Sequence, residues 1–199
     1  MTEPLIIENF LPKSYQDELE QILTSSFFPW IYQSNTDYIT EENQIEYNQI
    51  YDPKAVPSQQ FIHMFQHFQT GPSNQYSLIH GIKYFIEEHT NLQVDSFLRA
   101  KSNLLLKDSS FPTDGYHQPH IDLGFYQERD FKSMVYYVND SDGDTFFFSN
   151  SPSDSRITQR VRPKKGTAIL FDRDIYHASS SPKVTDKRLV INLNILYKE

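Results

Sequence analysis

The chain has 199 residues, a formal net charge of −8 and no cysteine. This length suits one domain, and the lack of cysteine excludes disulfides, thiolate metal sites and cysteine nucleophiles, which leaves His, Asp and Glu as metal ligands. The negative charge disfavours a broad nucleic-acid-binding surface, and the many Tyr and Phe residues favour a β-rich core.

The first part of the chain is predicted to be mainly helical. There is no charged-then-apolar leader and no apolar run near twenty residues, so we expect a cytoplasmic protein without a membrane span. An amphipathic helix is predicted after Pro12. A polar segment from Gln33 to Tyr51 is expected to be a loop. Apolar stripes predict two more helices, from Pro57 to Phe68 and from Asn74 to Glu88, separated by Gly71-Pro72.

From about residue 94 the pattern changes to short alternating or apolar runs between turn residues, which is typical of strands. These runs span roughly 97–106, 116–121, 132–139, 145–149, 157–161, 167–171, 175–178 and 188–197. Helices followed by strands predict an α+β, mainly β protein whose core is a sandwich or barrel. We therefore expect one domain over residues 1–199, with a helical part to about residue 93 and a β core over about 94–199.

The last predicted strand has two different faces, because alternate side chains of a strand point to opposite sides. One face is entirely apolar and should pack under the helices: Leu189, Ile191, Leu193 and Ile195. The other face carries Arg188, Asn192 and Asn194. It either meets solvent or lines the mouth of a barrel, and this strand alone leaves both open.

Three stretches of the β-rich part, taken together, predict a metal site. His120 and Asp122 lie two residues apart, so in a strand both side chains point the same way. His177 would complete two histidines and one carboxylate, the ligand set of non-haem iron(II) oxygenases. Arg188, eleven residues beyond His177, could hold the far carboxylate of a keto-acid cosubstrate. His117 is a second-ranked ligand, because its spacing places it opposite Asp122.

Each of these pieces has an ordinary explanation when it is taken alone. An isolated His-x-Asp is commonly a hydrogen-bonded surface pair, and a lone histidine is often a satisfied core residue. The ordered set is what favours a metal site. Four further histidines fall in the predicted helices without an acidic partner at ligand spacing, and we interpret them as structural or surface residues: His63, His67, His80 and His89.

The motifs occur in a characteristic order between Arg99 and Tyr197. They are His120-x-Asp122, Val135–Asn139, Gly143–Phe146, Val161–Phe171, His177 and Arg188. This order resembles that of the iron(II) and 2-oxoglutarate-dependent dioxygenases, particularly the prolyl 4-hydroxylase-like branch. The chain departs from that pattern at Gly143-Asp144-Thr145, where Gly-Gly-Glu-Thr is commoner, and at Val190, where one large branch has a serine.

The resemblance implies a double-stranded β-helix, or cupin-like jelly roll, with flanking N-terminal helices and iron at one open end. It implies three metal-binding and catalytic residues: His120, Asp122 and His177. It also implies cosubstrate contacts from Arg188, whose planar fork suits a carboxylate, and from Tyr137 and Asn103.

The implied function is an Fe(II)- and 2-oxoglutarate-dependent dioxygenase that uses O2 to hydroxylate an unidentified substrate, such as a prolyl residue or a small metabolite. Because Asp122 is present, hydroxylation is favoured over halogenation. Two alternatives stay open. One is a catalytically inactive metal-binding jelly roll that captures a ligand, and the other is a zinc-dependent hydrolase with the same ligands. The sequence does not predict the oligomeric state.

Overall fold

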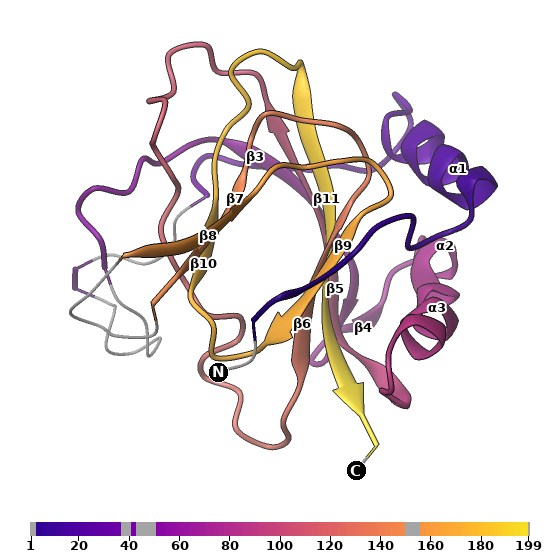
Figure 1. Cartoon of the computed structure of the whole chain (residues 1–199). Helices are drawn as coiled ribbons and strands as arrows, with labels where there is room; N and C mark the ends of the chain where they lie inside the picture. The colour runs from indigo at the N-terminus through magenta and orange to yellow at the C-terminus, as the bar shows by residue number, and fades with distance from the viewer. Residues whose placement is uncertain (1–2, 37–40, 43–50, 150–155, 199) are drawn as a thin grey trace.

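The protein consists mainly of antiparallel strands in two facing sheets, with three helices on one side (Figure 1). The computed structural model describes residues 3–36, 41–42, 51–149 and 156–198, so most of the loop expected between Gln33 and Tyr51 lies outside the described residues. The elements are β1 (Leu5–Ile7), α1 (Lys13–Leu23), β2 (Ile31–Gln33), β3 (Gln60–His67), β4 (Gly71–Pro72), α2 (Ser77–His80), α3 (Ile82–His89), β5 (Val94–Leu106), β6 (Lys132–Tyr137), β7 (Thr145–Phe148), β8 (Ile157–Val161), β9 (Ala168–Asp172), β10 (His177–Ser179) and β11 (Lys187–Tyr197).

The two sheets have the connectivity of a double-stranded β-helix. The larger sheet has the order β1-β9-β6-β11-β5-β3-β2, with β4 beside β3, and the smaller has the order β10-β7-β8. After β6 the chain crosses to the smaller sheet for β7 and β8, returns for β9, crosses for β10 and returns for β11. This alternation confirms the predicted α+β, mainly β class with a jelly-roll core.

The main core lies between the larger sheet and the helices. The apolar face of β11 is fully buried there, and Leu189 and Ile191 are each 0% exposed. It belongs to the same cluster as Leu19 and Leu23 of α1 and Ile82 of α3. Burying each such side chain contributes about 1.5–3 kcal/mol, so this face fixes which side of β11 points away from the helices. The sequence-based prediction for the apolar face is confirmed.

The helix predicted from Pro57 to Phe68 is wrong, because this segment forms β3. The apolar stripe arises from a register shift in the pairing of β3 with β5, between Met64 and Gln66, which interrupts the strict alternation of a strand. The long strand β5 needs a partner along its free edge, and β3 supplies it. Two of the four histidines assigned to helices therefore lie on a strand. His63 among them is buried, and its ring contacts the Pro29 carbonyl at 3.0 Å.

The other predicted helices are confirmed with adjusted bounds. The helix after Pro12 is α1, and the third predicted helix is divided into α2 and α3 at Gly81. The region before residue 94 is nevertheless less helical than expected, since it also contains β1 to β4. Among the described helices, none has the length and apolar character needed to cross a membrane.

Candidate metal centre

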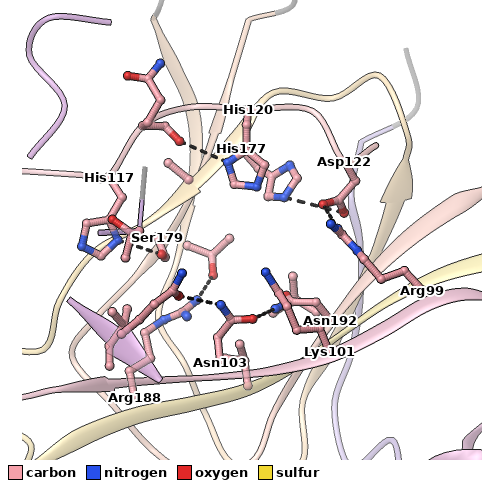
Figure 2. A pocket seen from close by; sticks show the side chains of 18 residues that line it. Arg99, Lys101, Asn103, His117, His120, Asp122, His177, Ser179, Arg188 and Asn192 are labelled. Atoms are coloured by element: carbon pink, nitrogen blue, oxygen red, sulfur yellow. Dashed lines mark hydrogen bonds and ion pairs between the residues drawn. The ribbon is translucent and has the colours of Figure 1, made fainter. Parts of the chain in front are cut away.

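The three predicted metal ligands converge at one end of the pocket between the two sheets (Figure 2). His177 opens β10, and the segment carrying His120 and Asp122 lies beside it. One ligand atom from each residue lies within 4.8 Å of the other two. His177 Nε2 is 4.0 Å from Asp122 Oδ2. The structure therefore brings together the set that the sequence pattern selected.

The local structure around His120 differs from the strand predicted over residues 116–121. His120 makes a single antiparallel bridge with His177, in which each backbone N–H donates to the other residue's carbonyl at 3.0 Å. Pro119 has no N–H with which to extend a regular ladder. The chain then turns, and Leu123 has a positive φ of 45°. The bridge and the turn, and not a regular strand, bring Asp122 to the same side as His120.

Backbone carbonyls fix the tautomer of both histidines. The Nδ1 atoms of His120 and His177 lie 3.1 Å from the carbonyls of Gln118 and Ile175, respectively. Since a carbonyl only accepts, each Nδ1 carries a proton, and Nε2 is the ring atom that each histidine can offer to a metal. Burial, with the nearby His177, lowers the pKa of His120 to about 3. His120 is therefore a neutral ligand, and the pattern is the usual one around metal-binding histidines.

Three side chains of the larger sheet hold Asp122 from behind. Arg99 on β5 donates to Oδ1 at 2.5 Å, while Ser133 on β6 and Asn194 on β11 donate to Oδ2 at 2.8 and 3.0 Å. Arg99 also donates to Asn194 at 2.8 Å. Burial alone would raise the pKa of Asp122, but Arg99 and the two histidines hold that pKa well below its usual range. Asp122 is thus an oriented carboxylate anion.

Arg188 lies on β11 at the other end of the same pocket and is 3% exposed. Its Nε donates to the Gly143 carbonyl at 2.8 Å, and one terminal nitrogen donates to Thr145 Oγ1 at 2.9 Å. A Cβ on Gly143 would lie 3.0 Å from Arg188 Cδ and 2.6 Å from a backbone oxygen, so this position requires glycine. Burial lowers the pKa of Arg188, which forms no ion pair with any residue that the structure describes. Within the described part of the chain it is a fixed cation that makes no direct ion pair.

The two other predicted cosubstrate contacts lie in different environments. Tyr137 is 0% exposed, and its hydroxyl donates to Thr145 Oγ1 at 2.8 Å, so it supports the residue that holds Arg188. Asn103 does line the pocket and bonds Gln60 and Asn192, at 2.6 and 2.8 Å. Direct contact of either residue with a cosubstrate stays a prediction.

Several pocket residues were not predicted. Arg99 and Lys101 lie on β5 four and two residues before Asn103, so the alternation of that strand, followed backwards from Asn103, would have found them. The second-ranked ligand His117 lines the pocket but is not part of the three-residue group. Its ring bonds Ser179 at 2.9 Å and Ser181 at 3.2 Å.

The apolar residues on one side of the pocket form two groups. Leu105 and Val135 line the pocket directly. Phe147 and Ile169 are buried in the cluster that packs behind Val135. Leu105 and Val135 thus add apolar surface to the pocket wall, and Phe147 and Ile169 pack in the core with Val135.

The comparisons with known proteins agree with this geometry. Residues 109–196 match the family model described as the 2OG-Fe(II) oxygenase superfamily, in which 2OG is 2-oxoglutarate. No curated protein matches the chain by sequence.

Solved structures of low sequence identity share the fold. A 2OG-Fe(II) oxygenase family oxidoreductase from Burkholderia pseudomallei is 10% identical with a TM-score of 0.66, and the match covers 96% of this chain and 84% of that one. A Pseudomonas putida prolyl-4-hydroxylase is 14% identical with a TM-score of 0.54, covering 98% and 93%. The α-ketoglutarate-dependent epimerase SnoN from nogalamycin biosynthesis is 10% identical with a TM-score of 0.56, covering 97% and 78%. Residues 109–196 thus resemble the 2OG-Fe(II) oxygenase superfamily, and the chain as a whole shares the fold of these solved structures.

Proposed function

We propose that this protein is an Fe(II)- and 2-oxoglutarate-dependent hydroxylase in which His120, Asp122 and His177 bind the metal and Arg188 binds the cosubstrate. The observation that carries the proposal is the pairing of two features in one pocket. A group of two imidazoles and one carboxylate lies at one end, and a buried arginine that forms no ion pair with a described residue lies at the other. A dianionic keto acid that reaches both ends matches this arrangement of charge.

The donor set fits ferrous iron. Each histidine bonds a carbonyl through Nδ1 and so offers Nε2 to a metal, and the Asp122 carboxylate is ionised and held by Arg99. Two nitrogens and one oxygen leave open positions for a bidentate cosubstrate and for dioxygen. Since the protein has no cysteine, a thiolate site of the kind common for structural zinc is excluded.

When bound, the iron supplies the redox chemistry by which 2-oxoglutarate, O2 and a C–H bond give succinate, CO2 and a C–OH group. The chain's own residues bind and shield. Arg188, held by Gly143 and Thr145, presents its remaining N–H groups to the far carboxylate. The apolar side chains of Leu105 and Val135 keep water from the space between the two ends of the pocket.

The substrate class at the level of the family is a small molecule or a peptide. Four points stay predictions from the sequence: the choice between these two substrate classes, the exclusion of nucleic acid, the cytoplasmic location, and the division of one domain near residue 94. A prolyl residue is one candidate substrate, because a solved structure of similar fold is a prolyl-4-hydroxylase.

The test combines metal binding with turnover. We expect the protein to bind Mn²⁺, a redox-stable stand-in for Fe²⁺, and to form succinate from 2-oxoglutarate only with Fe²⁺ and O2. His177→Ala should abolish both, whereas Arg188→Ala should keep Mn²⁺ binding and weaken 2-oxoglutarate binding by 100-fold or more. Metal binding without succinate would favour the inactive ligand-binding module. Activity with Zn²⁺ in the absence of O2 would favour the hydrolase.

A further inference from the structure

The floor of the pocket carries a third cation that the proposed function does not use. Arg99, Lys101 and Asn103 alternate along the inner face of β5, and Arg188 and Asn192 lie on the same face of β11. In Figure 2 this wall lies opposite His120 and His177. Arg99 is paired with Asp122 and Arg188 is assigned to the cosubstrate. Lys101 forms no hydrogen bond or ion pair with any residue that the structure describes.

Lys101 lies at the metal end of this floor. It is opposite Asn192 in the pairing of β5 with β11, whereas Arg188 is opposite Leu105. Four residues along a strand span about 13 Å, so the backbone positions of Lys101 and Arg188 are separated by about that length. Lys101 is close enough to Asp122 and His120 to affect both electrostatically. The two unpaired cations therefore serve different ends of the pocket.

A row of neutral amides borders Lys101. Asn192 donates to Asn103 at 2.8 Å, Asn103 to Gln60 at 2.6 Å, and Gln60 to Gln33 at 2.9 Å. These side chains hold one another in place and continue the polar floor from Lys101 towards β3 and β2. They offer hydrogen bonds to a ligand, but none of them carries a charge that could neutralise Lys101.

A structural role does not account for this lysine. Burial in the pocket wall, together with Arg99, lowers the pKa of Lys101 to about 8, so the amine is still protonated at neutral pH. Lys101 is only partly exposed, and an ammonium group in a pocket wall without an ion pair to a described residue is unfavourable, so a bound anion would stabilise it. Because the whole chain carries a net charge of −8, an anionic ligand needs a local cation of this kind to enter.

We propose, on the basis of the proposed function, that Lys101 binds a carboxylate of the prime substrate, and that the substrate is a small carboxylic acid held over the Lys101–Asn192–Asn103 floor. The cosubstrate is also a carboxylate, so the two sources of the same chemistry must be separated. In the proposed function Arg188 binds the far carboxylate of the cosubstrate and the metal binds its near carboxylate. The charge of Lys101 is therefore available to the substrate.

The test uses protein loaded with Mn²⁺ and saturating 2-oxoglutarate, which cannot turn over. Paired probes are added that differ only in charge: acetate and acetamide, N-acetylproline and N-acetylprolinamide, N-acetylleucine and N-acetylleucinamide. Paramagnetic relaxation of the probe protons by Mn²⁺ reports binding near the metal. At least one carboxylate should bind tenfold or more tightly than its carboxamide, because hydrogen bonds to charged groups are the stronger ones. Lys101→Met should abolish this preference, and Lys101→Arg should retain most of it.

The matched control is Lys107→Met, which removes an exposed lysine from the end of the same strand and should change nothing. The Kd for 2-oxoglutarate should stay within threefold in Lys101→Met. A tenfold or larger rise in that Kd would assign Lys101 to the cosubstrate and overturn the proposal, as would equal binding, or no binding, of both members of every pair. Failure of the proposed function is distinguishable, since the unsubstituted protein would then not bind Mn²⁺ and 2-oxoglutarate at all.

Discussion

Replacing Arg99 with methionine tests the carboxylate-holding cluster behind the metal site. The side chains of Arg99 and Asp122 are only 13% and 9% exposed, so the change leaves a buried carboxylate with two neutral donors, Ser133 and Asn194. Breaking such a buried pair costs about 3–5 kcal/mol. For a chain of this length that lowers the Tm of the metal-free protein by roughly 6–20 °C.

A bound metal should reverse part of this loss. Mn²⁺ supplies positive charge to the same carboxylate, so it replaces some of what Arg99 provided, and a ligand that binds only the folded state raises stability. We therefore expect saturating Mn²⁺ to raise the Tm of Arg99→Met by more than it raises the Tm of the unsubstituted protein. Arg99→Lys, which keeps the charge, should lie between the two.

Thermal unfolding followed by circular dichroism, with and without Mn²⁺, measures both effects. Asp122→Asn provides the second arm of a double-mutant cycle, in which Arg99→Met should cost much less once the carboxylate is gone. If Arg99→Met lowers the free energy of unfolding by less than about 1 kcal/mol, which is the range of an exposed ion pair, the reasoning is refuted. Equal Mn²⁺-induced shifts in the two proteins would refute it as well.

Three further changes test other contacts of the pocket. Arg188→Lys should weaken 2-oxoglutarate binding less than Arg188→Ala does, since lysine keeps the charge but loses the fork that bonds Gly143 and Thr145; calorimetric titration measures the difference. Tyr137→Phe should raise the Kd for 2-oxoglutarate less than tenfold, because its hydroxyl bonds Thr145; a loss as large as that of Arg188→Ala would show direct contact. Burial, with Arg188 and His120, lowers the pKa of His117 to about 3. Between pH about 6.5 and about 3 the unfolded chain therefore binds one more proton at this residue than the folded chain does, and the free energy of unfolding falls as the pH falls. In denaturant titrations His117→Gln should reduce that slope by up to about 1.4 kcal/mol per pH unit.

The convergence of His120, Asp122 and His177 was predictable from the sequence, because the chemistry of a metal site depends on residue type and order. The backbone that positions them was not, since the argument from a regular strand gave the right side for His120 and Asp122 through the wrong local structure. The turn at Leu123, with φ of 45°, has no glycine to mark it. What holds it is the bridge to His177 and the cluster around Asp122, and both are tertiary contacts.

The wrong helix over 57–68 and the open question about the polar face of β11 share a cause. A helical stripe over 57–68 and a strand with a register shift place apolar residues at similar spacings, and only the free edge of β5 decides between them. The polar face of β11 was ambiguous for the same reason. Its partner strands, β5 and β6, determine that Arg188 and Asn192 face a pocket and not solvent. Pairing between distant strands is information that no local pattern contains.

The three cations of the pocket floor differ in what each one contacts, and this difference argues for three separate tasks. Arg99 donates hydrogen bonds to Asp122 and Asn194, so it positions a proposed metal ligand. Arg188 is anchored by two bonds and keeps other donors free, which suits an oriented carboxylate at a fixed distance. Lys101 has no anchor and is a flexible point charge, which suits an anion whose position varies with the substrate. Exchanging Arg188 and Lys101 in type should therefore impair cosubstrate binding more than substrate binding, because the fork geometry matters only where the partner is always the same.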